Sequence, residues 1–295
     1  MDKKFEQLKK EYKNIPIPDE LDFVVERALK NGKKKTKSGL KWIVGTAAAA
    51  ILFIGGLNIS PAMASTLSEL PVVGNIIKVL TFTEFKVDKD KYQADIKVPA
   101  VTDAENGVLA QSLNDKYLQE GKELYEQFTA DVEDLEKNGG GHLGVDSGYE
   151  VKTDNDQILS IARYVVNTVG SSSTVMKYDT IDKKNKILLS LPILFKDNGY
   201  IERISENIKE QMRAQMKDTN LEKVYWVSDS GLKDEDLVEL FESIKKDQNF
   251  YINNEGKLVI SFDKYEVAPG YMGVVEFVIP TEQITDLLVS NEYIK

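Results

Sequence analysis

The hydrophobic positions near the start of the chain predict two short amphipathic helices. Their apolar residues recur three or four positions apart, which places each set on one face of a helix. Pro16 and Pro18 break the pattern between the two sets. The first set is Phe5, Leu8 and Tyr12, and the second includes Leu21, Val24 and Val25. Helices this short cannot bury an apolar face alone, so we expect them to bind a partner protein; the alternative is a helix lying on the membrane surface.

A longer apolar run follows and predicts one transmembrane helix. Trp42–Ile59 contains 18 residues, and no charged residue lies between Lys41 and Glu69. As a helix this run is about 27 Å long at ~1.5 Å per residue, enough to span a bilayer. Lysines at positions 33, 34, 35, 37 and 41 place the preceding segment in the cytoplasm by the positive-inside rule. The predicted location is the cell membrane, with a single span, a cytoplasmic N-terminus and an extracellular C-terminus; a buried core helix is the alternative.

Small residues directly after the span predict a signal-peptidase cleavage site. Pro61 ends the helix, and Ala62-x-Ala64 is the pattern that the peptidase accepts, which places the scissile bond between Ala64 and Ser65. A secretory leader has a much shorter polar region than the 41 residues that precede this span. Two interpretations stay open: secretion with an unusual leader, or an anchored protein that is cut conditionally. Thr66–Thr81 predicts an amphipathic segment beside the bond, which we expect to shield it.

The rest of the chain alternates strand-like and helix-like patterns, which predicts an exported α+β domain with antiparallel sheet and long helices. Period-two patterns predict strands over residues 83–87, 93–98, 144–153, 158–168, 174–181, 187–191, 250–252, 258–262 and 274–279. Period-3.6 patterns predict helices over residues 105–137, 200–216 and 234–246. The predicted organisation is a cytoplasmic segment (1–41), a transmembrane helix (42–60), the cleavage box with its amphipathic segment (61–82) and two α+β units (83–185 and 186–295).

Charge divides the chain into a basic head and an acidic body. Met1–Lys41 holds 12 Lys and Arg against 7 Asp and Glu, whereas Ser65–Lys295 holds 26 against 41. The resulting charge of −15 on the body steers a basic ligand toward it. The chain has no cysteine, so the body must be stable without disulfides, which is ordinary on Gram-positive surfaces.

Residues that support catalysis are sparse. His142 is the one histidine and has no cysteine to share a metal with, so we expect a loop residue rather than a zinc site or a Ser-His-Asp triad. Carboxylates suited to a glycosidase occur only as solvated acids, on the exposed face of a predicted helix or in a turn; they are Asp131, Glu133, Asp134 and Glu136, and Asp154 and Asp156. The sequence contains no Gly-rich phosphate loop or basic aromatic patch. It therefore predicts a protein that is not an enzyme, with no cofactor, no metal and no nucleic-acid partner.

One loop has the character of a recognition element. Between two predicted strands, Pro269 and Gly270 form a turn dipeptide that would project Tyr271 and Met272. A rigid turn that presents an aromatic side chain suits protein recognition, because tyrosine offers contact area at low entropic cost. The alternative is a structural turn with Tyr271 packed inward. The Gly170–Ser173 turn, which contains Ser171 and Ser172, is a weaker candidate of the same kind.

Several longer stretches of sequence show that the chain resembles the RsiV family of anti-sigma factors. Members of this family are membrane receptors for lysozyme that restrain the extracytoplasmic-function (ECF) sigma factor sigma-V in Gram-positive bacteria. The resemblance runs nearly end to end, and Asp229–Lys246 departs from the family pattern by its greater length. Besides the span and its Ala-x-Ala exit, it is carried by MDKKFEQLKKEYKNIPIPDELD, TIDKKNKILLSL, KEQMRAQMKD and KLVISFDKYEVAPGYMG.

This resemblance implies a mechanism. Residues 1–41 hold the sigma factor inactive until extracellular lysozyme binds the body. Signal peptidase then cuts after Ala64, and an intramembrane site-2 protease cuts the remaining span. The released sigma factor induces lysozyme resistance. The resemblance also implies lysozyme contacts at Pro269, Gly270 and Tyr271, with a second region at Ser171 and Ser172. Two other interpretations stay open: an exported protein that binds or processes peptidoglycan fragments, with a cleavable or anchored leader, and a receptor of this architecture for an envelope fragment.

Overall fold

The computed structural model describes residues 78–102, 107–218, 222–231 and 239–295. All of them belong to one compact unit, Ser65–Lys295, and the preceding unit, Met1–Ala64, lies outside the described residues. The predicted cytoplasmic helices, the span and the cleavage box therefore stay predictions. Within the described ranges, no helix is both long enough and apolar enough to cross a membrane.

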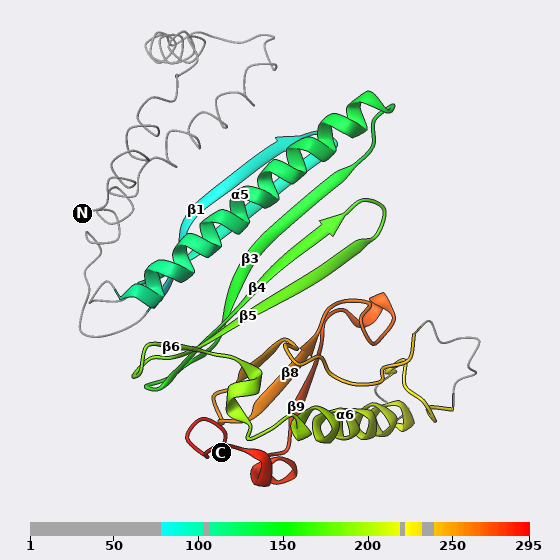
Figure 1. Cartoon of the computed structure of the whole chain (residues 1–295). Helices are drawn as coiled ribbons and strands as arrows, with labels where there is room; N and C mark the ends of the chain where they lie inside the picture. The colour runs from blue at the N-terminus through cyan, green and yellow to red at the C-terminus, as the bar shows by residue number, and fades with distance from the viewer. Residues whose placement is uncertain (1–77, 103–106, 219–221, 232–238) are drawn as a thin grey trace, which may run out of the picture. The chain divides into compact units, whose positions relative to one another are not determined.

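The described residues form two β-sheets, and the larger has six strands that follow each other in sequence order. They are β1 (Lys78–Lys89), β2 (Tyr92–Thr102), β3 (Leu143–Asp154), β4 (Ile158–Thr168), β5 (Ser172–Asp182) and β6 (Ile187–Leu189). Neighbouring strands are antiparallel, as predicted, except that β2 and β3 run parallel. Helix α5 (Val108–Lys137) lies between these two strands in the sequence and returns the chain to the end of the sheet at which β2 begins. Parallel pairing requires such a connection. In Figure 1, α5 lies along one face of the sheet, beside β1 and β3.

Helix α5 confirms the predicted long helix from residue 108 onward. Its apolar stripe is buried against the sheet, and Leu113, Tyr117, Phe128 and Val132 are each less than a tenth exposed. Gly121 allows close approach to β2, because a Cβ at that position would lie 2.6 Å from Val98 Cγ2. The helix ends where Gly139 adopts a φ of +102° and Gly140 N–H donates to the Leu135 carbonyl at 2.7 Å.

The smaller sheet has three antiparallel strands that pack with helix α6 into the main core. The strands are β7 (Phe250–Ile252), β8 (Leu258–Phe262) and β9 (Val275–Ile279), and α6 spans Gly199–Lys217. The apolar stripe of α6 is fully buried at Ile204, Ile208 and Met212, as its 3.6-residue period predicts. Short 3-10 helices occur at Leu191–Leu194, Gly270–Met272, Thr281–Gln283 and Thr285–Leu287. These elements confirm the predicted α+β class.

The two sheets are joined by hydrogen bonds and by one stacked aromatic pair. The hydroxyl of Thr153, on β3, donates to the Ile252 carbonyl on β7 at 2.6 Å. The Tyr178 and Tyr251 rings stack with their centroids 5.6 Å apart, and each hydroxyl donates to the Glu276 carboxylate at 3.0 Å. Burial and the neighbouring Glu276 charge raise the pKa of both tyrosines, so both hydroxyls remain donors at neutral pH. The smaller sheet is therefore held in a defined position against the larger one.

The third predicted helix, 234–246, is wrong over its described part, residues 239–246. There, Phe241 N–H donates to the Trp226 carbonyl at 2.8 Å and Ile244 N–H to Ser205 Oγ at 2.9 Å. These backbone groups are satisfied outside their own segment, so no helix is needed to pair them. The three-residue spacing that suggested a helix instead brings Phe241 and Ile244 into the core from an irregular segment.

The predicted amphipathic segment, Thr66–Thr81, is wrong over its described part, residues 78–81, which belongs to a strand. Lys78–Thr81 forms the start of β1, which begins five residues before the predicted strand at 83–87. Residues 66–77 lie outside the described part of the chain. The register pairs residue 78 with Thr102 and Lys89 with Tyr92, which places the beginning of β1 at the opposite end of the sheet from the turn that follows β4.

Candidate functional site

Two exposed segments, one from each sheet, meet at the outer edge of β5. The first is the hairpin turn Val169–Ser171 between β4 and β5, and the second is the loop Asp263–Val274 between β8 and β9, which we call the recognition loop. Val169 is 64% exposed and Tyr271 is 69% exposed, so both segments present apolar surface to solvent. Exposed apolar side chains of this size are common at protein-recognition surfaces.

The recognition loop is attached to β5 because that strand is only partly paired. β4 pairs with β5 along its whole length, but β6 covers the other side of β5 only at Thr180–Asp182, which leaves backbone groups near the start of β5 without a strand on that side. The loop satisfies them: Met176 N–H donates to Asp263 Oδ1 at 2.7 Å, and Lys264 N–H donates to the Thr174 carbonyl at 3.2 Å.

A lysine side chain connects the loop to the hairpin. Lys264 Nζ donates to Ser172 Oγ at 2.8 Å and lies 5.2 Å from the centroid of the Tyr265 ring. Tyr265 adopts a φ of +72°, an unusual conformation for a residue with a side chain, and its ring covers Gly270. A Cβ at Gly270 would lie 2.2 Å from two atoms of that ring, so only glycine fits there without a shift. The chain of contacts Ser172–Lys264–Tyr265–Gly270 thus brings together the two regions that the sequence analysis considered separately.

The tip of the recognition loop confirms one prediction and corrects another. Pro269 and Gly270 form the predicted turn, in which Met272 N–H donates to the Pro269 carbonyl at 2.9 Å. Tyr271 points to solvent, so the alternative of an inward-packed Tyr271 is wrong. Met272 does not project with it, because its side chain is half-buried and packs against the core, to which the buried Val267 and Ala268 also belong. The core therefore anchors the loop on both sides of Tyr271.

The two acids of the recognition loop are balanced by one lysine of the loop and one lysine from outside it. Burial raises the pKa of the Asp263 carboxyl, the Met176 N–H opposes this shift, and the neighbouring Glu266 charge adds to it. Lys245 Nζ donates to Glu266 Oε1 at 2.9 Å, and this hydrogen bond raises the pKa of Lys245. Two acids are thus matched by Lys245 and Lys264. Long-range attraction of a basic ligand must come from the acidic body as a whole.

The remaining predicted chemistry stays outside this site. His142 is exposed in the segment just before β3, which confirms that it is a loop residue. The four acids on α5, Asp131, Glu133, Asp134 and Glu136, are exposed, as are Asp154 and Asp156. Among the described residues, no group of three His, Cys, Asp or Glu side chains is placed to hold a metal. The predicted sigma-factor-binding residues lie outside the described part of the chain.

Sequence reasoning missed Asp263 and Lys264, the two residues that dock the loop. No periodicity marks them, because they act from the irregular backbone that follows β8. The only available signal is a pair of opposite charges directly after an apolar strand. Their partners lie on β5, some 90 residues earlier, and such long-range pairing is not visible in a local pattern.

Comparison with known proteins places these features in a family context. Residues 34–167 match a domain of unknown function, DUF4179, and residues 194–282 match a protein family of unknown function, DUF3298. The chain is 50% identical over 296 aligned positions to the anti-sigma-V factor RsiV of Bacillus subtilis (strain 168), and the alignment covers all of both chains.

Solved structures share the fold at lower identity. A DUF3298 family member from Bacteroides fragilis is 18% identical, with a TM-score of 0.50, and the match covers 73% of this chain and 94% of that one. A DUF3298 family protein from Pseudomonas aeruginosa PAO1 is 12% identical, also with a TM-score of 0.50, and the match covers 74% and 97% of the two chains. At these identities the likeness concerns the fold alone.

Proposed function

Because the chain belongs to the family of the anti-sigma-V factor RsiV, whose anti-sigma role implies a sigma-factor partner, we propose that it is a transmembrane receptor that releases its sigma factor when lysozyme binds outside the cell. In this proposal residues 1–41 sequester a sigma-V-type ECF sigma factor through Phe5, Leu8, Tyr12, Leu21, Val24 and Val25. The protein is a regulator rather than an enzyme, and the exported body is its sensor.

The observation that supports this proposal most strongly is the joined recognition surface. Lys264 holds the recognition loop to the hairpin at Ser172, and Tyr271 stands exposed beside it. A partner protein can therefore contact the hairpin turn and the loop tip at the same time, without a large rearrangement of either. Lysozyme is basic, which suits a body that carries 41 acidic and 26 basic residues.

We further propose that Tyr271 enters the substrate cleft of lysozyme. An exposed aromatic on a rigid turn fills a cleft at low entropic cost, and the cleft of a glycosidase is the largest concavity such a partner offers. Lysozyme bound in this way is inhibited. Full lysozyme activity in the saturated complex would exclude this mode of binding.

Release of the sigma factor follows from two cuts. Signal peptidase cleaves between Ala64 and Ser65, and a site-2 protease then cleaves within the span Trp42–Ile59. Only 12 residues, 66–77, separate Ser65 from the start of β1. The first residue of β1 and the hairpin turn lie at opposite ends of the larger sheet, about 35 Å apart along strands that rise ~3.3 Å per residue. In this proposal, ligand binding at one end of the sheet acts on a bond that residues 66–77 connect to the strand beginning at the other end.

Two linked experiments test the proposal. Binding of lysozyme to the purified chain is measured by calorimetry, with Tyr271→Ala expected to weaken it at least tenfold and Val289→Ala, an exposed residue after the last 3-10 helix, expected to leave it unchanged. In cells, the intact protein is followed with and without lysozyme. Loss of intact protein should require lysozyme, and Ala64→Trp should block it, because the peptidase accepts only small residues there.

The outcomes separate the competing functions. Lysozyme binding together with lysozyme-dependent cleavage supports the receptor proposal. Binding of glycan fragments without lysozyme binding supports a peptidoglycan-binding protein instead. Cleavage at equal rates with and without lysozyme would show a secreted protein with a long leader.

A further inference from the structure

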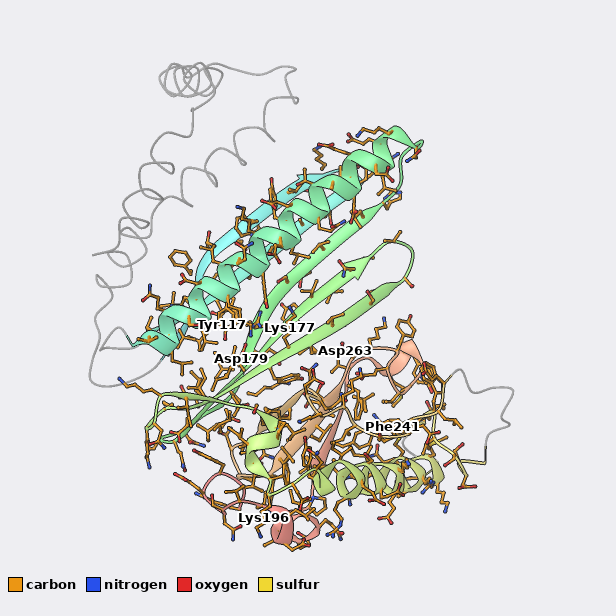
Figure 2. The ribbon with its side chains drawn as sticks, viewed as in Figure 1. Tyr117, Lys177, Asp179, Lys196, Phe241 and Asp263 are labelled. Atoms are coloured by element: carbon orange, nitrogen blue, oxygen red, sulfur yellow. The ribbon has the colours of Figure 1, made fainter. Side chains whose placement is uncertain are left out.

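Tyr265 occupies a turn position that is normally filled by glycine or asparagine. The turn after β8 begins at Asp263, labelled in Figure 2, and Glu266 N–H closes it by donating to the Asp263 carbonyl at 3.0 Å. Tyr265 is the third residue of this turn and has a φ of +72°, whereas the φ of Lys264 is negative. These values match a type II turn, whose third position favours glycine or asparagine. A bulky aromatic residue at this position is strained.

Packing inside the chain does not explain why this strain is kept. Tyr265 is 45% exposed and does not belong to the hydrophobic core. The turn is also closed from its other side without the ring, because Asp263 N–H donates to Glu266 Oε2 at 2.8 Å. Backbone strain that stabilising contacts do not account for is typical of functional positions.

The ring of Tyr265 supports the backbone that carries Tyr271. It lies against Gly270, in the space that a side chain at Gly270 would occupy. Gly270 is the first residue of the 3-10 turn Gly270–Met272, and its carbonyl accepts a hydrogen bond from Gly273 N–H at 3.2 Å. Without the ring, open space beside Gly270 would allow this turn to move. The ring therefore limits the directions in which Tyr271 points.

We propose that Tyr265 is a positioning residue of the recognition loop, whose ring fixes the turn that presents Tyr271 to the partner protein. This inference rests on the proposed function, in which Tyr271 contacts lysozyme. A side chain that already points in its bound direction loses less conformational entropy when the partner arrives. The strained conformation of Tyr265 thus lowers the stability of the free chain and raises its affinity for the partner.

Two substitutions separate the ring from the strain. Tyr265→Asn removes the ring and introduces a residue type that adopts a positive φ more readily, whereas Tyr265→Phe keeps both the ring and the strain. Neither substitution changes the charge, so long-range attraction of a basic partner is the same in both. Lysozyme binding to the full chain in detergent micelles is measured by calorimetry, and the melting temperature by circular dichroism.

Tyr265→Asn should bind lysozyme at least tenfold more weakly than the wild type, yet its melting temperature should stay within ~4 °C of the wild-type value, because relief of strain offsets the lost ring contacts. Tyr265→Phe should match the wild type in both measurements. A residue with a purely structural role would lose stability and affinity together.

A double-mutant cycle tests whether Tyr265 acts through Tyr271. In a Tyr271→Ala background no ring remains to be positioned, so the addition of Tyr265→Asn should weaken lysozyme binding by less than a further factor of two. If the two losses multiply instead, Tyr265 contributes to binding independently of Tyr271, and the positioning role is wrong.

Amide hydrogen exchange tests the same role without a partner. The Met272 and Gly273 amides donate to the Pro269 and Gly270 carbonyls, so their exchange rates report how often the turn opens. Both amides should exchange at least tenfold faster in Tyr265→Asn than in the wild type, and at the wild-type rate in Tyr265→Phe.

The inference is overturned if Tyr265→Asn binds lysozyme as tightly as Tyr265→Phe, if its exchange rates are unchanged, or if its melting temperature falls by more than ~4 °C, which would show that the ring supports the fold as a whole. Failure of the proposed function gives a different result. A wild-type chain that does not bind lysozyme excludes lysozyme as the ligand, and faster exchange in Tyr265→Asn would then still support the positioning of Tyr271.

Discussion

Lys264→Met tests whether the recognition surface works as one unit. The substitution keeps most of the apolar stem of the side chain and removes the ammonium group, so it breaks the 2.8 Å hydrogen bond to Ser172 and the contact with the Tyr265 ring. A half-buried hydrogen bond from a charged donor contributes about 1 kcal/mol, and a cation–π contact at such a site about 0.5–1 kcal/mol. The backbone bond from Lys264 N–H to Thr174 remains, so the loop stays attached to β5.

The expected loss of lysozyme affinity is therefore about 1.5–2 kcal/mol, or roughly 10- to 30-fold, if the complex needs the loop held against the hairpin. Lys196→Met is the matched control, because Lys196 also donates through Nζ, to the Asp286 carbonyl at 2.8 Å, and lies far from the loop in Figure 2. Both variants make the body one charge more negative, so their long-range attraction for a basic ligand rises equally. Calorimetry at two salt concentrations measures both. Equal affinities for the two variants would refute the idea that Lys264 joins the two contact regions.

Two further predictions concern stability. Asp179 is 2% exposed and accepts hydrogen bonds from Tyr117, Arg163 and Lys116, so Asp179→Ala should lower the free energy of unfolding, measured in urea, by about 3–5 kcal/mol. Asp286→Ala is the control: it removes an exposed ion pair and should lower the free energy of unfolding by less than about 1 kcal/mol. Similar losses in the two variants would contradict this account of the buried cluster. Burial raises the pKa of Asp263 in the folded state above its ordinary value, so its contribution to stability is fully present below that ordinary value of 3.8 and is lost as the pH rises through the folded-state pKa. Asp263→Asn does not titrate, so its free energy of unfolding should rise relative to that of the wild type as the pH increases from 3.5 to 7. If the difference between the two free energies of unfolding stays flat or falls over this range, burial does not disfavour the Asp263 charge.

The sequence was most informative where a regular element carries a long apolar stripe. The stripes of α5 and α6 repeat over several turns, and the structure confirms both helices. The prediction at 234–246 was wrong over residues 239–246 because two apolar residues three apart, Phe241 and Ile244, fit an irregular segment as well as a helix. Short patterns do not show where the backbone hydrogen bonds of a segment go, and here they go to Trp226 and Ser205.

Part of the candidate site was predictable from the sequence and part was not. Its tip was predictable, because Pro269 and Gly270 favour a turn whatever surrounds them and Tyr271 follows directly. Its docking was not, because Asp263 and Lys264 act on backbone and side-chain groups of β5 that are exposed only because β6 is short. The buried Arg163 cluster is likewise invisible in the sequence, where its members are ordinary polar residues scattered from Lys116 to Asp179.

By itself the sequence determined the α+β class, most of the described helices and strands, the acidic character of the body and the turn at Pro269 and Gly270, since each depends on local periodicity, local turn chemistry or a sum of charges. The exposure of Tyr271 was left open by the sequence and was decided by the structure. Only the tertiary structure decided the parallel pairing of β2 with β3, the joining of the recognition loop to the hairpin, and the collection of Arg163, Asp179 and Glu120 into one cluster of ion pairs. These features join residues that lie far apart in the chain. Which distant groups meet depends on how the sheets and helices pack to bury their apolar faces, and no local pattern contains that information.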